Sequence, residues 1–434
     1  MCLLQYKHRE VNTRLKNIIF HIDVNSAFLS WEAVYRIAHK GGKLDLREVA
    51  SAVGGDMSMR HGIILAKSIP AKKYGIQTGE TILDAQRKCP ELILVPPNYG
   101  LYETCSAAFM DILREYSDVV EQYSIDEAFI DMTPTCHLFG TPVETAEEIK
   151  NRIREELGFT VNVGISCNKL LAKMASDFKK PDRVHTLYIE EIENKMWPLP
   201  VSDLFFVGRA TTKKLLSLGI RTIGDLAKAD PKWLKCMLKK QGEIIWGFAN
   251  GIDCSPVLES PQPNKGYGNS TTIPYDVVDT PDANKVLLAL AETVGSRLRA
   301  DEVQIEVISV GIRYSDLSYV SHQKRLLSST NITAEIYSAA CELFIELWNG
   351  NPIRHLGIHT SKVQDDDFIR QMNLFDETDY EKLAKIDATV DEIRARFGID
   401  AVKRAVFVDQ SIDHMSGGIS REKRSVDYDK VVIQ

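Results

Sequence analysis

Three acidic side chains stand in stretches of sequence that are otherwise apolar. Asp23 ends the run at 18–24, and Asp126 and Glu127 lie side by side within 117–133. A carboxylate in such surroundings is costly unless its charge is compensated, and a divalent cation compensates it well. Mg²⁺ prefers hard oxygen ligands, typically one or two carboxylates plus the phosphates of a substrate. The trio therefore indicates a metal site for phosphoryl transfer, in which two metals about 3.5–4 Å apart hold the attacking and leaving oxygens.

The spacing of the acidic pair leaves a second interpretation open. Adjacent strand residues point to opposite faces, so Asp126 and Glu127 share a site only if a turn or bulge redirects one of them. Otherwise the pair decorates a solvent-exposed turn. The pattern by itself favours neither interpretation.

The elements that must position these acids can be read from the same region. The run at 18–24 predicts a buried strand, and 27–39 has helical spacing. Residues 117–133 predict two strands around a tight turn, and 160–166 predict another strand. A lysine-rich helix at 168–180 ends at a proline. Strands and helices alternate, which predicts an α+β or α/β first half.

Composition bounds the rest. A length of 434 residues suggests two to four domains, and 44% hydrophobic with 26% charged residues is an ordinary globular mixture. This excludes a disordered chain, a collagen and a disulfide-stapled mini-protein. The net charge of −7 argues mildly against a nucleic-acid binder. The proline-rich stretch 254–265 predicts a linker, followed by a second α+β unit at 266–360.

The cellular location of the protein can also be predicted from the sequence. No apolar run approaches the roughly 20 residues that a membrane span needs. The N-terminus carries charged residues and no apolar signal core, so secretion is not expected. The eight cysteines are scattered without a C-x-x-C pair, which predicts free thiols in a reducing cytosol. We therefore expect a cytoplasmic protein without a membrane segment.

Three motifs occur in order along the first half of the chain: HIDVNSAF, SIDEAFIDMT and VGISCNKLLAKMASDFKKPD. Together they resemble the Y-family (DinB/UmuC class) of translesion DNA polymerases, of the bacterial type. The resemblance runs from about residue 18 to 360. It implies an α+β right-hand polymerase with a palm, small fingers, a helical thumb that contains a helix-hairpin-helix, and a C-terminal little-finger domain. The implied parts are the palm at 1–36 and 78–190, the fingers at 37–77, the thumb at 191–253, the linker at 254–265, the little finger at 266–360 and a tail at 361–434.

The resemblance also assigns roles to the acidic trio. Asp23 and Asp126 would ligate two Mg²⁺ ions, and Glu127 would complete the site at the metal that faces the primer 3′-hydroxyl. The carbonyl oxygen of Val24 would be a backbone ligand.

The resemblance implies a nucleotide pocket beside these acids. Lys72 and Lys180 would bind the triphosphate, because phosphoryl transfer needs cations there. Phe28 would be the steric gate that rejects a ribose 2′-hydroxyl. Two positions depart from the family pattern. Ile69 stands where many relatives carry a tyrosine, and Ala27 stands where many carry an aromatic residue. We therefore expect a thinner phosphate clamp than the pattern implies.

The DNA-holding parts are less uniform. Residues 202–226 resemble a helix-hairpin-helix, and 208–242 hold nine basic against two acidic residues, a local charge of +7. Phe206 replaces the first glycine of the usual G-x-G, which puts a tight backbone approach in doubt. The 266–360 region is not basic. The candidate DNA contacts are Arg209, Lys213 and Lys214 in the thumb, and Arg313, Lys324 and Arg325 in the little finger.

The tail contains two further signals. The peptide QMNLF at 371–375 resembles the segment that binds the β-type sliding clamp, with Gln371, Leu374 and Phe375 as its anchors. Residues 379–397 then predict an amphipathic helix that could pack on the body or bind another partner. Its apolar stripe consists of Leu383, Ile386, Val390, Ile393 and Phe397.

These expectations lead to one preferred function and two alternatives. The preferred function is a monomeric, low-fidelity, template-directed DNA polymerase for damage bypass, which binds primer–template DNA, deoxynucleoside triphosphates and the clamp. A catalytically inactive, clamp-associated DNA-binding accessory protein is the first alternative, and the retained trio argues against it. A nucleotide cyclase with a palm-like fold is the second, and the basic hairpin region has no role there.

Overall fold

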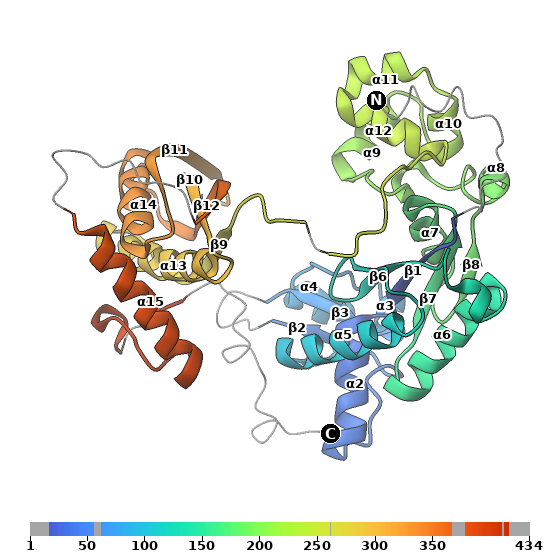
Figure 1. Ribbon diagram of the computed structural model, residues 1–434, viewed down its shortest axis with the longest axis horizontal. Coiled ribbons are helices and arrows are strands. Elements are labelled where there is room, and N and C mark those ends of the chain that lie inside the picture. Colours follow the sequence, from blue (N-terminus) through green and yellow to red (C-terminus); the bar gives the residue numbers. More distant parts are fainter. Residues whose placement is uncertain (1–16, 56–61, 261, 367–377, 410–411, 416–434) are drawn as a thin grey trace.

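A computed structural model describes residues 17–55, 62–260, 262–366, 378–409 and 412–415. Two sheets come from the N-terminal half, a helical unit follows, and a third sheet lies toward the C-terminus (Figure 1). An extended segment joins this third sheet to the rest.

The five-stranded sheet carries the predicted carboxylates. Its order is β5-β6-β1-β7-β8, and β1 in the centre is antiparallel to both neighbours. Every residue of β1 and β7 is buried, as their continuous apolar runs predict. The strands are β1 (Ile19–Val24), β5 (Val120–Gln122), β6 (Glu127–Asp131), β7 (Val161–Ser166) and β8 (Val184–Thr186).

Helices cover the two faces of this sheet differently. On one face, α2 (Ala27–Lys40), α5 (Tyr99–Arg114) and α6 (Pro142–Leu157) form a core with Phe20, Ile22 and Ile165. On the other face, α7 (Lys169–Ser176) lies directly against β7. A Cβ added at Gly164 would come within 1.9 Å of the Ala172 carbonyl oxygen, so only glycine permits this approach. The alternation along β1 places Asp23 on the α7 face.

The three-stranded sheet forms the small lobe. Its order is β3-β2-β4, and α3 and α4 accompany it. Because β4 pairs in parallel with β2, residues 78–95 belong to this lobe, although the sequence suggested the palm for them. The elements are β2 (Ser51–Gly54), β3 (Ile64–Lys67), α3 (Ile69–Lys73), α4 (Ile82–Lys88) and β4 (Ile93–Val95).

The helical unit has its own core, which continues into α7 through Leu170, Leu171 and Met174. The predicted linker begins as a docked segment, because Val257 packs against Ile19 and Phe129 of the first sheet and against Ala172 of α7. The helices are α8 (Ile192–Lys195), α9 (Arg209–Ser217), α10 (Ile223–Lys228), α11 (Pro231–Leu238) and α12 (Lys240–Ala249).

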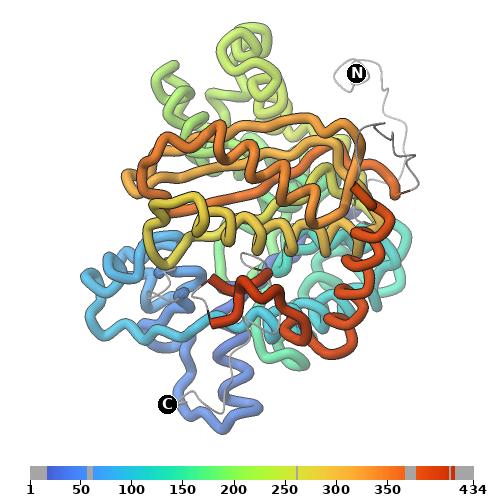
Figure 2. The backbone as a smooth tube through the Cα atoms, turned by 90° about the vertical axis from the view of Figure 1, so that its left-hand side faces the viewer, coloured from blue at the N-terminus to red at the C-terminus, as the bar shows by residue number. Residues whose placement is uncertain are grey.

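The C-terminal unit is a four-stranded sheet of order β11-β10-β12-β9 with two helices on one face (Figure 2). Its long strands alternate between residues of the helix-covered core and residues of the open face. The elements are β9 (Gly268–Val277), α13 (Thr280–Ala300), β10 (Val303–Tyr314), β11 (Tyr319–Thr330), α14 (Thr333–Leu347) and β12 (Ile353–Asp365).

The tail adds to this unit. Helix α15 (Tyr380–Phe397) lies against α13, and Phe407 and Ile412 are buried in the same core. The carboxylate of Glu292 on α13, only 4% exposed, is paired with Arg394 at 3.3 Å and with Arg404 at 2.6 Å. Residues 378–409 and 412–415 therefore form a docked C-terminal module rather than a separate tail.

We predict that Arg394→Met destabilises the C-terminal unit by about 3 kcal/mol, because removing one partner of a buried ion pair leaves an uncompensated charge. Arg396→Met is the matched control: Arg396 lies on the same helix in an exposed pair with Glu392, which contributes at most about 1 kcal/mol. Urea unfolding of both variants measures the difference. Equal urea midpoints for the two variants would show that the ion pair between Arg394 and Glu292 does not stabilise the C-terminal module.

Two expectations from composition can be compared with the structure. Among the described residues, no helix has the length and apolar character to cross a membrane. Six cysteines are free thiols, namely Cys89, Cys105, Cys136, Cys167, Cys236 and Cys341. Cys254 is disulfide-bonded, so the expectation of free thiols is wrong for that residue.

Candidate active site

The hairpin of β5 and β6 brings the carboxylates together. Asp23 and Glu127 are direct cross-strand partners, so their side chains share one face of the sheet. Asp126 precedes β6, and its carbonyl oxygen accepts a hydrogen bond from the Val24 N–H at 3.0 Å. The Ser124 hydroxyl donates to Asp126 Oδ1 at 2.7 Å. Asp126 therefore lies in the turn before β6, so the alternation of strand residues does not by itself separate it from Glu127.

Lysines from the α7 side neutralise two of these acids. Lys180 Nζ forms an ion pair with Asp23 Oδ2 and a second one with Asp177 at 2.8 Å. Lys173 Nζ donates to both carboxylate oxygens of Glu127, at 2.8 and 2.9 Å. The sequence placed Lys180 on a triphosphate, whereas in this structure it rests on Asp23. The side chain of Lys173 is largely buried.

Burial dominates the electrostatics of Asp23. It raises the pKa of the Asp23 carboxyl to about 6, against the opposing charge of Lys180 and with a further upward contribution from Glu127. Beneath the acids, burial and the nearby lysines hold the pKa of His21 well below its usual value. His21 Nδ1 lies 2.8 Å from the Ser176 hydroxyl, which fixes the ring against α7.

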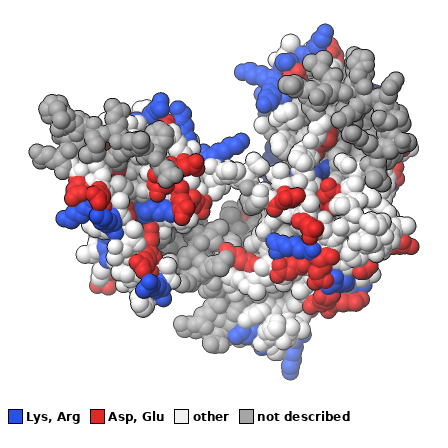
Figure 3. Space-filling model, in the orientation of Figure 1, with Lys and Arg blue, Asp and Glu red and all other residues white. Residues whose placement is uncertain are grey.

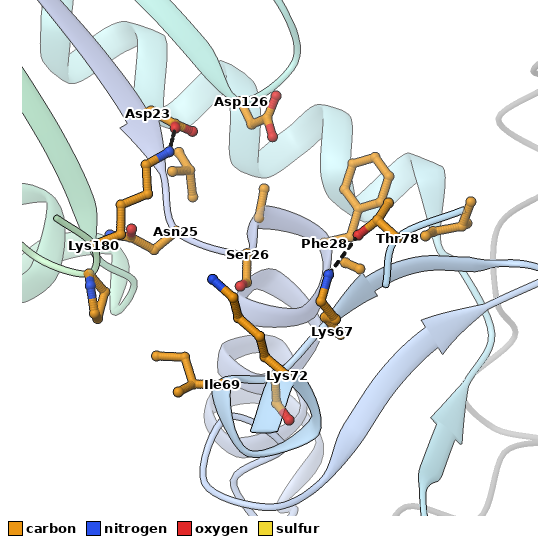
Figure 4. Close-up of a pocket in the computed structure, with 16 residues that line it drawn as sticks. Asp23, Asn25, Ser26, Phe28, Lys67, Ile69, Lys72, Thr78, Asp126 and Lys180 are labelled. Carbon is orange, nitrogen blue, oxygen red and sulfur yellow. Dashed lines mark hydrogen bonds and ion pairs between the residues drawn. The ribbon is translucent and has the colours of Figure 1, made fainter. Parts of the chain in front are cut away.

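A cavity of about 460 Å³ opens beside Asp23 (Figure 4). The carboxylates of Asp23 and Asp126 and the ammonium of Lys180 lie toward one end, and Phe28 lies toward the other. Lys72 reaches in from α3 between them. The cavity is lined by 23–28, 65–69, Lys72, Thr78, Asp126, Lys180 and Pro181.

The start of α2 forms one wall of this cavity. Its first residues, including Ala27 and Phe28, line the wall, and the N-cap Ser26 has φ 50° and makes no side-chain cap. The first N–H groups of a helix lack intrahelical partners and favour anions. This end of α2 therefore suits phosphate oxygens, which compensates in part for the apolar Ile69 that also lines the cavity.

The ring of Phe28 is held in place. It is half-buried and stacks on the Tyr102 ring with centroids 4.3 Å apart and planes 9° from parallel. Tyr102 is fully buried, so the floor beneath Phe28 is rigid. Such a ring presents a fixed surface to whatever enters the cavity.

Sequence reasoning missed other lining residues. Lys67 is the last residue of β3, and its side chain points into the cavity and donates to the Thr78 hydroxyl at 3.2 Å. Asn25 and Ser26, which precede α2, also line the cavity. The available signal for Lys67 was a basic residue at the end of an apolar strand, two residues before α3 begins.

The predicted hairpin of the helical unit keeps its geometry without the first glycine. Phe206 adopts φ 72°, the left-handed region that favours glycine, and the Gln241 side chain donates to its carbonyl oxygen at 3.0 Å. Arg209, Lys213 and Lys214 are exposed on α9. Figure 3 shows lysine and arginine side chains gathered over this unit.

The open face of the C-terminal sheet carries two of the three basic candidates. Arg313 lies 5.9 Å from the Tyr319 ring, and Arg325 is paired with Glu306 at 2.9 Å while staying two-thirds exposed. Lys324 faces the other way and is paired with Glu342 of α14. Strand alternation explains the difference, since neighbours in β11 point to opposite faces.

The tail predictions have different outcomes. Gln371, Leu374 and Phe375 lie outside the described residues. The predicted amphipathic helix is present as α15, but it docks through charged residues, because Arg299 of α13 pairs with Asp387 and Asp391 at 3.2 and 2.6 Å. The apolar stripe stays partly exposed, and Phe397 is 73% exposed.

Comparison with known proteins agrees with this architecture. A family model described as "impB/mucB/samB family" matches residues 22–177, its C-terminal domain matches 264–374, and a "DNA polymerase-iota, thumb domain" model matches 202–253. The chain is 44% identical to "DNA polymerase IV" of Clostridium acetobutylicum over 396 residues, which cover 91% of this chain and 99% of the relative. It is 38% identical to "DNA polymerase IV 1" of Bacillus subtilis, over 89% of this chain and 92% of the relative.

Among solved structures, a "Y-family DNA polymerase chimera Dbh-Dpo4(243-245)-Dbh" superposes with a TM-score of 0.68 at 24% identity, over 80% of this chain and 99% of that one. The fold is thus that of a right-hand DNA polymerase with palm, fingers, thumb and little finger. The chain belongs to the impB/mucB/samB family, the Y-family of translesion DNA polymerases. Such an enzyme uses a divalent metal and binds primer–template DNA and nucleotides.

Proposed function

We propose that this translesion polymerase adds deoxynucleotides to a primer 3′ end at the cavity beside β1, with Asp23, Asp126 and Glu127 as the carboxylates that hold two Mg²⁺ ions. The carbonyl oxygen of Val24 would add a backbone ligand. In this reaction the 3′-hydroxyl attacks the α-phosphorus, the bond to the bridging oxygen breaks, and pyrophosphate leaves. Bound metal supplies charge stabilisation at the attacking and leaving oxygens.

The residues present fit divalent cations. The cavity end is rich in carboxylate oxygen, the donor that Mg²⁺ prefers, and the raised pKa of Asp23 reflects a buried negative charge that Lys180 only partly compensates. A cation that replaced Lys180 at Asp23 would free that lysine for another anion.

The basic side chains then bind the triphosphate. Lys180 would leave Asp23 and contact phosphate oxygens, and Lys72 reaches the same cavity from α3. The N–H groups at the start of α2 add donors without charge. Phe28 is the steric gate under the sugar. These contacts position the nucleotide, which is most of what phosphoryl transfer asks of a protein.

DNA would lie across three parts of the molecule. The five-stranded sheet unit is the palm, the small lobe the fingers, α8–α12 the thumb and β9–β12 the little finger. Arg209, Lys213 and Lys214 would contact phosphates from the hairpin, and Arg313 and Arg325 from the open sheet face. Lys324 contributes only if it leaves Glu342. Two observations support these proposed DNA contacts: the five arginine and lysine side chains other than Lys324 are exposed, and residues 208–242 have a local charge of +7.

Partners and location are proposed from the sequence. Gln371, Leu374 and Phe375 would dock a β-type sliding clamp, the enzyme would act as a monomer, and it would work in the cytoplasm. The clamp peptide stands between two parts of the chain that both belong to the C-terminal unit, β12 and α15. A pull-down of clamp by the full chain, compared with Leu374→Ala plus Phe375→Ala, tests the docking.

One observation supports the catalytic proposal most directly: two carboxylates, three lysines and an aromatic ring line a single cavity. Primer extension on a gapped template with Mg²⁺ tests it. We expect nucleotide addition opposite undamaged and damaged template bases. A purified protein that adds no nucleotide would favour the inactive accessory protein.

We predict that divalent-metal affinity falls as the pH drops below about 6, because only the ionised carboxylate of Asp23 binds metal and its pKa is raised to about 6. Each further pH unit should weaken binding by up to about tenfold. Mn²⁺ titration followed by electron paramagnetic resonance between pH 5 and 8 measures this. Constant affinity across that range would contradict the role of Asp23.

A further inference from the structure

Lys67 is a cation in the nucleotide cavity that the proposed chemistry leaves without a role. It ends β3, and its half-buried side chain points into the cavity together with that of Thr78 (Figure 4). Its ammonium donates to the Thr78 hydroxyl at 3.2 Å. Among the described residues it has no carboxylate partner within ion-pair distance, unlike Lys180, which is bound to Asp23.

The backbone around this pair is firmly held. Lys67 is the cross-strand partner of Ala52, and the next residue, Ser68, donates its N–H to the Ser51 carbonyl at 3.0 Å. On the Thr78 side, the Gly79 N–H donates to the Ile64 carbonyl oxygen at 2.8 Å. The Lys67 ammonium and the Thr78 hydroxyl therefore come from two segments whose backbones are hydrogen-bonded in place, as a selective contact requires.

The position of the pair in the cavity separates it from the phosphate end. Asp23 and Lys180 lie at one end, whereas Lys67 and Thr78 lie beside the ring of Phe28 at the other (Figure 4). With the triphosphate near the carboxylates and the sugar over Phe28, the part of a nucleotide that reaches the Lys67 end is the base. Burial and the charge of Lys72 lower the pKa of the Lys67 ammonium, which marks it as partly desolvated.

Bases differ in what they offer an ammonium donor. On the edge away from the sugar, guanine presents O6 and N7 as acceptors and thymine presents O4, whereas cytosine presents an amino group that donates. A lysine ammonium has three donors and accepts nothing. It can hydrogen-bond to guanine and thymine, and it meets the amino group of cytosine unfavourably.

We propose that Lys67, positioned by Thr78, contacts the base of the incoming nucleotide and favours insertion of dGTP and dTTP over dCTP. The inference rests on the proposed function, because it takes the cavity as the nucleotide site. Lys67 is thereby a specificity-determining residue of the same reaction. A hydrogen bond from a charged donor supports a preference of about 5- to 10-fold.

Single-nucleotide insertion kinetics test the proposal, with kcat/KM measured for all four correct pairs. Lys67→Met keeps the length of the side chain and removes its charge, and we expect it to reduce the ratios dGTP/dCTP and dTTP/dCTP by about 5- to 10-fold. Thr78→Val should reduce the same ratios by a smaller factor, because the ammonium loses its positioning partner. Lys73→Met is the matched control, since Lys73 is exposed on the same lobe outside the cavity lining, and it should leave all ratios unchanged.

The outcomes separate this inference from the function beneath it. A parent enzyme that inserts no nucleotide contradicts the proposed function. An active parent with Lys67→Met lowered equally for all four nucleotides would place Lys67 on the triphosphate and overturn the proposal. Unchanged ratios and rates in Lys67→Met would overturn it as well.

Discussion

Asp126→Asn is expected to lower kcat for primer extension by about 10³-fold or more. The substitution keeps the size of the side chain and removes the charge, and the charge stabilisation at stake amounts to several kcal/mol, where each 1.4 kcal/mol changes a rate tenfold. The backbone should not move, because the bond from the Val24 N–H goes to the carbonyl oxygen of Asp126 and not to its carboxylate. Pre-steady-state extension with saturating nucleotide measures the change.

Asp111→Asn provides the control for that experiment. Asp111 is an exposed carboxylate on α5 that pairs with its helical neighbour Arg114. It should extend primers like the parent. Extension by Asp126→Asn at the rate of Asp111→Asn would show that the carboxylate in the turn has no part in the reaction.

Phe28→Ala is expected to reduce discrimination against ribonucleotides by about 10²-fold, chiefly through gain of ribonucleotide insertion. The stack of Phe28 on the buried Tyr102 leaves the ring no room to retreat from a 2′-hydroxyl, and alanine removes the obstacle. The ratio of kcat/KM for dATP to that for ATP, measured opposite the same template base, checks this.

Truncating Phe28 also removes packing, so Phe28→Tyr is the companion variant. It keeps the bulk of the ring and should keep the discrimination. Thermal unfolding of both variants shows whether the fold is retained. If Phe28→Ala excludes ribonucleotides as well as the parent does, the steric-gate role is wrong.

The strands and helices of the first half were predictable because burial there is nearly complete. The apolar run of β1 and the motif that becomes α7 carried enough pattern to place Asp23 at the end of a central strand. The metal site that we propose for Asp126 and Glu127 could not be derived from alternation. It depends on a turn held by Ser124 and by a backbone bond to Val24.

Other features depend on contacts between distant segments, which a single sequence does not show. The C-terminal module docks through Arg394 and Glu292, 102 residues apart. The apolar stripe of α15 suggested that this face would pack on the body. In the structure the buried residues of α15 are the charged Asp387 and Arg394. Lys67 escaped notice for the same reason, since its role depends on Thr78 across the small lobe.

The net charge of −7 can now be understood by region. The hairpin region is strongly basic, while acidic residues serve internal pairs such as Glu121 with Lys169 and Glu342 with Lys324. Those acids neutralise lysines rather than repel DNA. Net charge was therefore a poor guide to the partner, whereas its distribution was a useful one.

The central claim is that Asp23, Asp126 and Glu127 hold two divalent ions at the nucleotide cavity. The most direct test is a crystal structure of the enzyme with primer–template DNA, a non-hydrolysable deoxynucleotide and Mn²⁺, with anomalous scattering used to locate the metal. The account predicts two Mn²⁺ ions, both in contact with Asp23 and Asp126 and one in contact with Glu127, with Lys180 moved to the triphosphate. Metal bound elsewhere, or Lys180 still paired with Asp23 beside a bound nucleotide, would contradict it.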